Sequence, residues 1–207
     1  AIMAFWGAPL EQPGHAAQAC LAALDCQKAL DSLQAKWSKA GLPEVEMRIG
    51  LNTGPMVVGY IGSMVKMDYT ALGDSVNLGS RLEGANKAYG TKILLSEETA
   101  AAAGDAIETR ELDLIVVQGR EKPVRVLELL GRKGELPQAR RRGYELFAEA
   151  LSAYRKMDWE KAEAGFKAAD AALGGDAPSR AFLDRFAWIR KRALPLDWDG
   201  SFALREK

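Results

Sequence analysis

The spacing of hydrophobic and polar positions changes several times along the first 131 residues. Residues 1–7 form an apolar run typical of a strand, and the residues from about His15 to Lys39 repeat apolar side chains at helical spacing. The Gly41-Leu42-Pro43 segment ends that helix. The residues predicted to form its buried face are Ala19, Ala23, Cys26, Leu30, Leu33 and Trp37.

Further along, short strands alternate with helices. Asp74 is predicted to cap a helix that runs through Asn86, and Ser96 to cap a shorter helix that ends near Ala103. Interleaved strands and helices, several joined by tight hairpins, favour a mixed α/β domain over a sandwich or a helical bundle. The predicted strands cover residues 45–51, 56–61, 67–72, 92–95, 113–117 and 123–130.

A charged, glycine- and proline-containing stretch after Gly131 predicts a boundary. We assign residues 1–131 to one domain, 132–142 to a linker and 143–207 to a helical extension. The extension resembles a single tetratricopeptide-type (TPR-like) hairpin, followed by a third helix from Ser179 to about Arg192. A lone hairpin cannot bury its own core, so we expect the third helix and residues 195–200 to help cover it.

Composition narrows the classes of function. The 28 basic and 28 acidic residues balance, which argues against a nucleic-acid partner or attraction to an anionic membrane. Cys20 and Cys26 are predicted to be buried core residues of a protein from a reducing compartment. Because His15 is the only histidine, catalysis that depends on histidine and a His-rich metal site are nearly excluded. No stretch has the length of a membrane span, so we expect a cytoplasmic location, with membrane contact only through upstream segments.

The stretch from Lys66 to Glu83 carries the candidate chemistry. Asn77 and Arg81 lie four residues apart, hence on one side of the predicted helix, directly after a strand that ends near Thr70. An amide can orient a ribose oxygen, and a guanidinium can stabilise charge on a transferring phosphoryl group. Spacing alone favours ordinary structural roles for these residues. Asn77 would form a hydrogen bond at the helix start, Arg81 would be a solvated surface charge, and Thr70 would be a β-branched residue that favours a strand.

Several ordered motifs resemble the class III adenylate/guanylate cyclase catalytic domain. The run from Tyr69 to Glu83 is similar to the family signature, and residues 1–9, 48–54 and 57–63 are similar to its other strands. The resemblance covers about residues 1–131 and implies a ferredoxin-like α+β domain with a mixed, mostly antiparallel sheet. Because residue 1 is not a methionine and an apolar run begins at once, we expect a piece of a longer protein, truncated before the family's first strands and helices.

The resemblance also implies roles for individual residues. Asn77 would position the ribose and Arg81 would stabilise the phosphate during attack of the 3′-hydroxyl on the α-phosphate of ATP. Thr70, with the backbone of Ala71 and the side chain of Val76, would line the base pocket and favour adenine over guanine. Arg120 or Lys122 would hold the triphosphate, since Gln118 stands where the family commonly has a lysine; a solvated turn is the equally weighted alternative.

The resemblance further implies a homodimer with Mg or Mn as cofactor. Two ions would be held by two aspartates upstream of Ala1, so we expect these 207 residues alone to be inactive. The active site would form between two cyclase domains, with residues 60–66 in an arm that reaches the partner. Two alternatives stay open: a degenerate, regulatory cyclase domain, for which Gln118 is the only hint, and a protein-interaction module built on the helices after Gly143.

Overall fold

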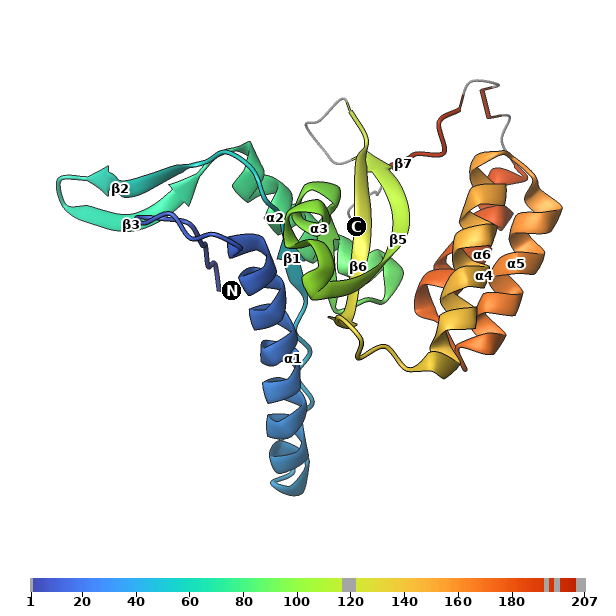
Figure 1. Cartoon of the computed structure of the whole chain (residues 1–207), viewed down its shortest axis with the longest axis horizontal. Coiled ribbons are helices and arrows are strands. Elements are labelled where there is room, and N and C mark those ends of the chain that lie inside the picture. Colours follow the sequence, from blue (N-terminus) through green and yellow to red (C-terminus); the bar gives the residue numbers. More distant parts are fainter. Residues whose placement is uncertain (1, 117–121, 192–193, 196–197, 204–207) are drawn as a thin grey trace.

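The computed structural model describes residues 2–116, 122–191, 194–195 and 198–203 of the chain (Figure 1). The helices are α1 (His15–Lys39), α2 (Asp74–Tyr89), α3 (Glu97–Ala103), the 3-10 turn η1 (Gly104–Ala106), α4 (Gln138–Arg155), α5 (Trp159–Ala172) and α6 (Ala177–Ile189). The strands are β1 (Ile49–Leu51), β2 (Val57–Ser63), β3 (Lys66–Leu72), β4 (Ile93–Ser96), β5 (Ile107–Val116), β6 (Val124–Arg132) and β7 (Phe202–Ala203).

The central sheet is mixed, which confirms the expected α+β class. Its strand order is β1-β4-β6-β5-β7. The β1–β4 and β5–β7 pairs are parallel, whereas β4–β6 and β5–β6 are antiparallel. The β2 and β3 strands form a separate antiparallel ribbon in which Ser63 pairs with Lys66 at the tip.

Alternate residues of β4 point to opposite faces of the sheet, and each face has its own core. Leu94 joins α2 and the helices α4–α6 on one face, whereas Ile93 and Leu95 join α1 and α3 on the other. The helical extension therefore shares one hydrophobic cluster with α2, β5 and β6. The helices of the extension thus bury their apolar faces partly against the sheet and α2, as expected for a hairpin that cannot bury its own core alone.

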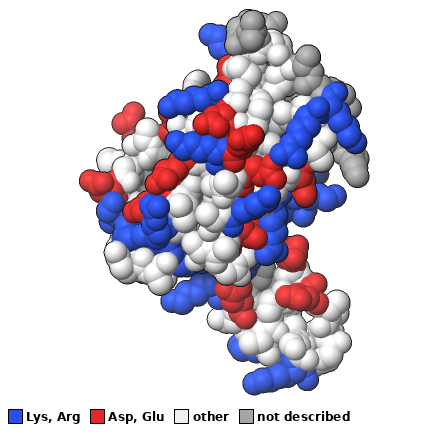
Figure 2. Space-filling view, turned by 90° about the vertical axis from the view of Figure 1, so that its right-hand side faces the viewer, with Lys and Arg blue, Asp and Glu red and all other residues white. Residues whose placement is uncertain are grey.

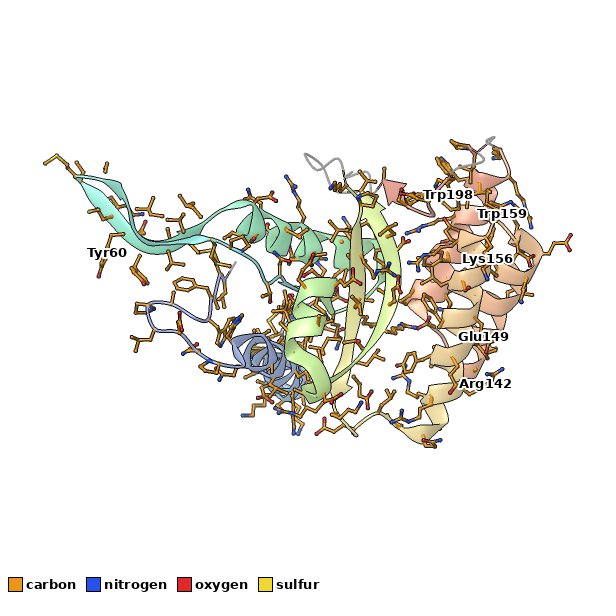
Figure 3. All side chains as sticks on the ribbon, turned by 45° about the horizontal axis from the view of Figure 1, so that its top comes forward. Tyr60, Arg142, Glu149, Lys156, Trp159 and Trp198 are labelled. Carbon is orange, nitrogen blue, oxygen red and sulfur yellow. The ribbon has the colours of Figure 1, made fainter. Side chains whose placement is uncertain are left out.

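The extension is built around buried aromatic rings. Tyr154 and Phe166 are fully buried, and Phe182 of α6 stacks on Phe166 with ring centroids 4.6 Å apart. Trp198 packs edge-on against Tyr154 at 5.3 Å and lies beside Trp159 at 5.8 Å (Figure 3). As expected, α6 and the segment around Trp198 cover the α4–α5 pair, while Leu196 and Asp197 lie outside the described residues.

Two parts extend from the body of the molecule. The β2–β3 ribbon projects to the left in Figure 1, and the C-terminal half of α1 projects downward. The buried residues of α1 are Ala16, Cys20, Ala23 and Gln27, while Cys26 and Leu33 are exposed. The predicted buried face was correct at Ala23 and wrong at Cys26 and Leu33, because the first half of α1 meets α3 and the sheet on the side that carries Ala16 and Cys20.

Three predicted strands differ from the structure, and the one predicted over residues 113–117 begins six residues earlier, as β5 at Ile107. Residues 2–7 form no strand, although they lie near β3, where the Phe5 ring is 6.0 Å from that of Tyr69. The strand predicted from Val45 begins only at Ile49. Before it, Gln27 donates to the Met47 carbonyl at 2.8 Å and Gln34 pairs with the Val45 backbone, so this segment follows α1 instead of a strand.

Charges of both signs are interspersed on the side of the molecule formed by the helical extension (Figure 2). Arg142 illustrates the pattern, since it lies 3.3 Å from both Glu145 and Glu149 on α4 (Figure 3). This side thus presents no broad basic surface to a polyanion. Among the described residues, none of the helices has the length and apolarity needed to cross a membrane.

Candidate functional site

The candidate site is built where β3 ends and α2 begins. Gly73, with φ +149°, makes the sharp exit from the strand, and the amides of Val76 and Asn77 donate to its carbonyl at 3.1 and 3.3 Å. Gly73 is the N-cap residue, so the prediction that Asp74 caps the helix was wrong. Asp74 lies in the first turn instead, where a carboxylate is favoured by the helix dipole.

Asn52 holds the start of α2 in place. Its side-chain amide donates to the Ser75 carbonyl at 2.9 Å. This hydrogen bond ties the first turn of α2 to a residue that lies 23 positions earlier in the chain. The neighbouring Gly54 leaves room for the Ser75 hydroxyl, because a Cβ at Gly54 would lie 2.5 Å from it. Sequence reasoning placed Asn52 only in a turn, and its polar side chain between two apolar strands was the signal that it missed.

Asn77 and Arg81 project from α2 one turn apart, as the sequence predicted. Asn77 is exposed, whereas Arg81 is half-buried. The Nη1 atom of Arg81 is buried and has no hydrogen-bond partner within the described part of the chain. A buried cationic donor without a hydrogen-bond partner costs free energy, so this nitrogen is suited to donate a hydrogen bond to an anionic ligand that reaches it.

The three residues predicted to line the base pocket lie in the same β3–α2 segment. Thr70 is half-buried and pairs with Gly59 of β2, while Ala71 is buried and pairs with Val58. Val76 is half-buried in the first turn of α2. The structure thus brings Thr70, Ala71, Val76, Asn77 and Arg81 together on one strand end and the helix that follows it.

The residues predicted to hold the triphosphate are on another element. Lys122 lies exposed in the bend before β6 and makes no hydrogen bond to Asn77 or Arg81. Gln118 and Arg120 lie outside the described residues. The described residues also contain no group of three or more His, Cys, Asp or Glu side chains that could hold a metal ion.

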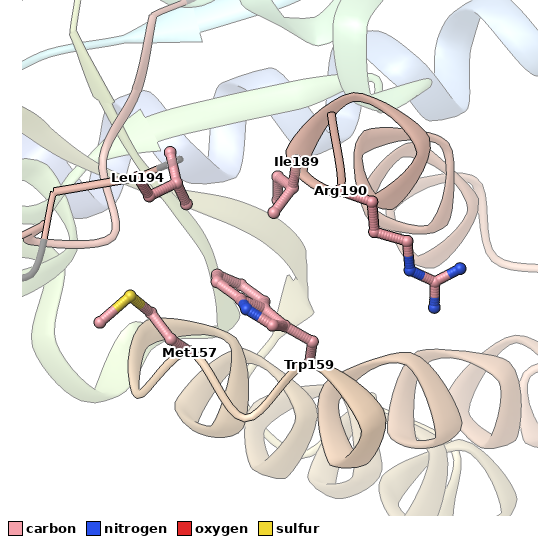
Figure 4. A pocket seen from close by; sticks show the side chains of 5 residues that line it. All are labelled: Met157, Trp159, Ile189, Arg190 and Leu194. Carbon is pink, nitrogen blue, oxygen red and sulfur yellow. The ribbon is translucent and has the colours of Figure 1, made fainter. Parts of the chain in front are cut away.

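Two shallow pockets lie away from these residues, on or beside the helical extension. One, of about 240 Å³, is lined by Met157, Trp159, Ile189, Arg190 and Leu194 (Figure 4). The other, of about 360 Å³, lies between β5 and α4 beside Glu111 and Arg155. Neither of these two pockets is lined by a predicted site residue.

Comparison with known proteins decides the family. Residues 1–128 match the family described as "Adenylate and Guanylate cyclase catalytic domain". The chain belongs to this cyclase family. Its sequence is 38% identical to "Adenylate cyclase 1" of Rhizobium meliloti over 130 residues, which cover 63% of this chain and 20% of that protein. The cyclase chain thus spans about a fifth of the length of that relative.

Solved cyclase structures share the fold. The adenylyl cyclase CyaB from P. aeruginosa is similar at 32% identity with a TM-score of 0.56, covering 63% of this chain and 67% of that one. The guanylate cyclase domain of RhGC from Catenaria anguillulae, in complex with GTP, is similar at 30% identity with a TM-score of 0.51, covering 61% and 65%. These similarities support a cyclase, adenylyl or guanylyl.

Proposed function

We propose that this chain is part of an adenylate cyclase, which converts ATP to 3′,5′-cyclic AMP and diphosphate. The observation that carries the proposal is the buried Nη1 of Arg81, which has no hydrogen-bond partner among the described residues and lies one helical turn from the exposed amide of Asn77. Such a pair supplies a fixed cation for a phosphate and a neutral hydrogen-bonding group for a sugar. Neither group has to change its protonation state during the reaction.

In the proposed reaction the ribose 3′-hydroxyl loses its proton to solvent and its oxygen attacks the α-phosphorus, while the bond from that phosphorus to the bridging oxygen of the diphosphate breaks. Asn77 hydrogen-bonds the ribose and holds the 3′-oxygen toward the phosphorus. Arg81 donates to the α-phosphate oxygens, on which negative charge concentrates in the transition state. The guanidinium keeps its proton throughout, because its pKa lies far above neutral pH.

We propose that Thr70, Ala71 and Val76 bind the base. Backbone at Ala71 and the apolar side chain of Val76 offer a flat, partly dry surface to a purine, and the Thr70 hydroxyl offers one hydrogen bond. A threonine here suits adenine and argues against the glutamate-based reading of guanine. Lys122 and Arg120 are proposed to bind the triphosphate from the loop before β6.

Mg or Mn is proposed as the cofactor of the complete enzyme. Two such ions would activate the 3′-oxygen and neutralise the phosphates when bound. The described residues of this chain form no ligand set for them, so the ligands are proposed to come from segments upstream of Ala1. The homodimer would then combine the metal side of one domain with Asn77 and Arg81 of the other.

The experiment uses the natural protein that contains this chain at full length, assayed with ATP and with GTP in the presence of Mn. We expect Asn77→Ala and Arg81→Ala to lower kcat by about 100-fold or more, with a smaller change in KM, because both groups act mainly in the transition state. Lys122→Ala should instead raise KM. Wild-type turnover in either helix variant would contradict the assigned roles, and activity with GTP alone would contradict the substrate.

A regulatory, degenerate cyclase domain remains the second candidate. The same full-length assay separates it from the enzyme, since a regulatory domain would form no cyclic nucleotide with either substrate. The interaction-module alternative is less well supported, because the large aromatic rings of the extension, Phe147, Tyr154, Phe166 and Phe182, are fully buried in the shared core.

A further inference from the structure

Three buried polar side chains join α6 of the helical extension to the last residue of α2. The Tyr89 hydroxyl donates to Asp113 Oδ2 at 2.5 Å, and Arg185 Nη1 donates to the same oxygen at 2.6 Å. Arg185 Nη2 donates to the Tyr89 hydroxyl at 3.0 Å, which closes the triangle. The second oxygen of Asp113 accepts from the Leu114 amide at 2.8 Å, so the carboxylate is fixed to β5.

This triangle is enclosed. Tyr89 and Asp113 are 0% exposed and Arg185 is 8% exposed. The guanidinium lies 4.5 Å from the Phe182 ring centroid and 4.1 Å from that of Phe202, which hold its plane by cation–π contact. Burial foremost, and Asp113 next, raise the pKa of Tyr89, while the charges around Arg185 raise its pKa despite burial, so neither group changes charge near neutral pH.

The triangle bears on the candidate site because α2 is one rigid element. Tyr89 ends α2, and Asn77 lies 12 residues earlier, roughly 18 Å along the helix axis. A tilt or a shift of the Tyr89 end moves Asn77 and Arg81 with it. A misplacement of about 1 Å at a reacting centre is enough to lower a rate by about 100-fold.

A second buried cluster joins the extension to the sheet without touching α2. Arg110 of β5 donates to both oxygens of Asp176, the N-cap of α6, at 3.1 and 2.7 Å, and to Glu128 of β6 at 2.7 Å. Arg110 is 8% exposed, the same fraction as Arg185. The two arginines are therefore matched in burial but not in partners, since Arg110 pairs with two carboxylates and Arg185 with one carboxylate and the Tyr89 hydroxyl. The hydrogen bond to Tyr89 links Arg185 to α2, whereas those of Arg110 go to β6 and to the N-cap of α6.

We propose that Arg185 is a positioning residue for the cyclase reaction: by holding Tyr89 and Asp113, it fixes α2 and thereby the placement of Asn77 and Arg81. The proposal rests on the proposed function. It gives the helical extension a role in catalysis, because α6 supplies a contact that the cyclase domain cannot make by itself. A buried, fully paired charge is suited to this task, since it specifies one geometry more sharply than apolar packing does.

The test compares Arg185→Met with Arg110→Met in the natural full-length protein, at a temperature below both melting points. Both variants leave buried carboxylates without their arginine partner and should lower Tm, Arg110→Met at least as much as Arg185→Met because it leaves two such carboxylates. Only Arg185→Met is expected to lower kcat, by about 10- to 100-fold, with KM for ATP changed less than about threefold. Arg110→Met should keep kcat within about twofold of wild type. Equal losses of kcat in both variants, or wild-type kcat in Arg185→Met, would overturn the proposal.

A double variant distinguishes an effect of Arg185 on the position of α2 from an effect on the stability of the fold. Arg185→Met combined with Asp113→Asn removes the orphaned charge and should recover much of the lost Tm. We expect kcat to stay low, because the contact that orients Tyr89 is still missing; recovery of kcat together with Tm would mean that Arg185 acts through stability alone.

A readout that needs no activity distinguishes this proposal from the proposed function. Hydrogen exchange of the amides in residues 74–89 should be faster in Arg185→Met than in Arg110→Met, measured against the global exchange of each variant. If the wild type forms no cyclic nucleotide, the proposed function fails, and exchange alone still shows whether Arg185 holds α2. Equal exchange of α2 in the two variants would refute the coupling even in an active enzyme.

Discussion

Gly50 of β1 lies directly against the backbone of α2 at Gly79, and Gly50 itself has no room for a side chain there. A Cβ at Gly50 would lie 2.1 Å from the Gly79 carbonyl oxygen and 2.3 Å from the Glu83 amide nitrogen. The helix that carries Asn77 and Arg81 thus touches the sheet backbone to backbone. This contact fixes the middle of α2, as Asn52 fixes its start.

We therefore expect Gly50→Ala to displace α2 and to destabilise the chain by about 1–3 kcal/mol, because the clash is with backbone and cannot be relieved by a rotamer. Gly79→Ala is the matched control. A Cβ at Gly79 would meet its nearest neighbours, Asn52 and Gly50, only at 3.9 Å. Alanine is also the better helix former, so this variant should be as stable as wild type or more stable. Urea denaturation measures both, and equal stability of the two variants would contradict the close contact.

The contrast between these glycines shows where sequence reasoning stopped. The period of hydrophobic residues predicted α2, β3 and the helices of the extension, because each buries one face along a continuous stretch. It failed for residues 2–7 and for Val45 to Met47, where the partner on the other side decides the structure. The hydrophobic pattern shows which residues prefer to be buried, but not which other segment of the chain packs against them.

The same limit applies to the candidate site. Asn77 and Arg81 were predicted because they lie four residues apart in one motif, so local geometry sets their relation. The Tyr89–Asp113–Arg185 triangle was not predicted, since its members are separated by 24 and 72 residues. No local spacing marks such a set, and Arg185 in the sequence looks like any surface arginine of a helix.

The two cysteines of α1 should react differently with thiol reagents. Cys20 is fully buried, and burial raises the pKa of its thiol from 9.0 to about 11, whereas Cys26 is exposed. We expect one thiol to react promptly with a disulfide reagent at pH 8 and the other only after unfolding. Prompt reaction of both thiols in the folded chain would contradict the burial of Cys20, and Cys26→Ser should abolish the fast phase.

Cys20 also predicts a loss of stability at alkaline pH. The folded thiol has the higher pKa, so its contribution is fully present below about pH 9 and is lost as pH rises toward 11. The loss should reach about 2–3 kcal/mol, since the unfolded chain ionises first. Urea denaturation at a series of pH values measures it, and Cys20→Ala should lack this component. An identical pH profile in wild type and Cys20→Ala would rule out the effect.

The β2–β3 ribbon should contribute to self-association if the proposed dimer forms. Tyr60, near the ribbon tip in Figure 3, is 73% exposed, and Met64 and Val65 at the tip are almost fully exposed. Apolar side chains this accessible favour contact with another surface. We expect Tyr60→Asp to weaken the dimer of the full-length protein by about tenfold or more in Kd, measured by sedimentation. Ala168→Asp adds the same charge on an exposed position of α5 and should leave the dimer intact.

Removal of the helical extension tests whether it packs or recognises a partner. Leu112, Ile115 and Val126 of the sheet are fully buried in the cluster that they share with α4, α5 and α6. A chain that ends at Gly131 would expose these side chains to water, at a cost of about 1.5–3 kcal/mol for each that becomes fully exposed. We therefore expect the shortened protein to aggregate or to melt well below the complete one. If it stays monodisperse with an unchanged Tm and loses only binding to another protein, the extension is a recognition module and its shared core contributes little to stability.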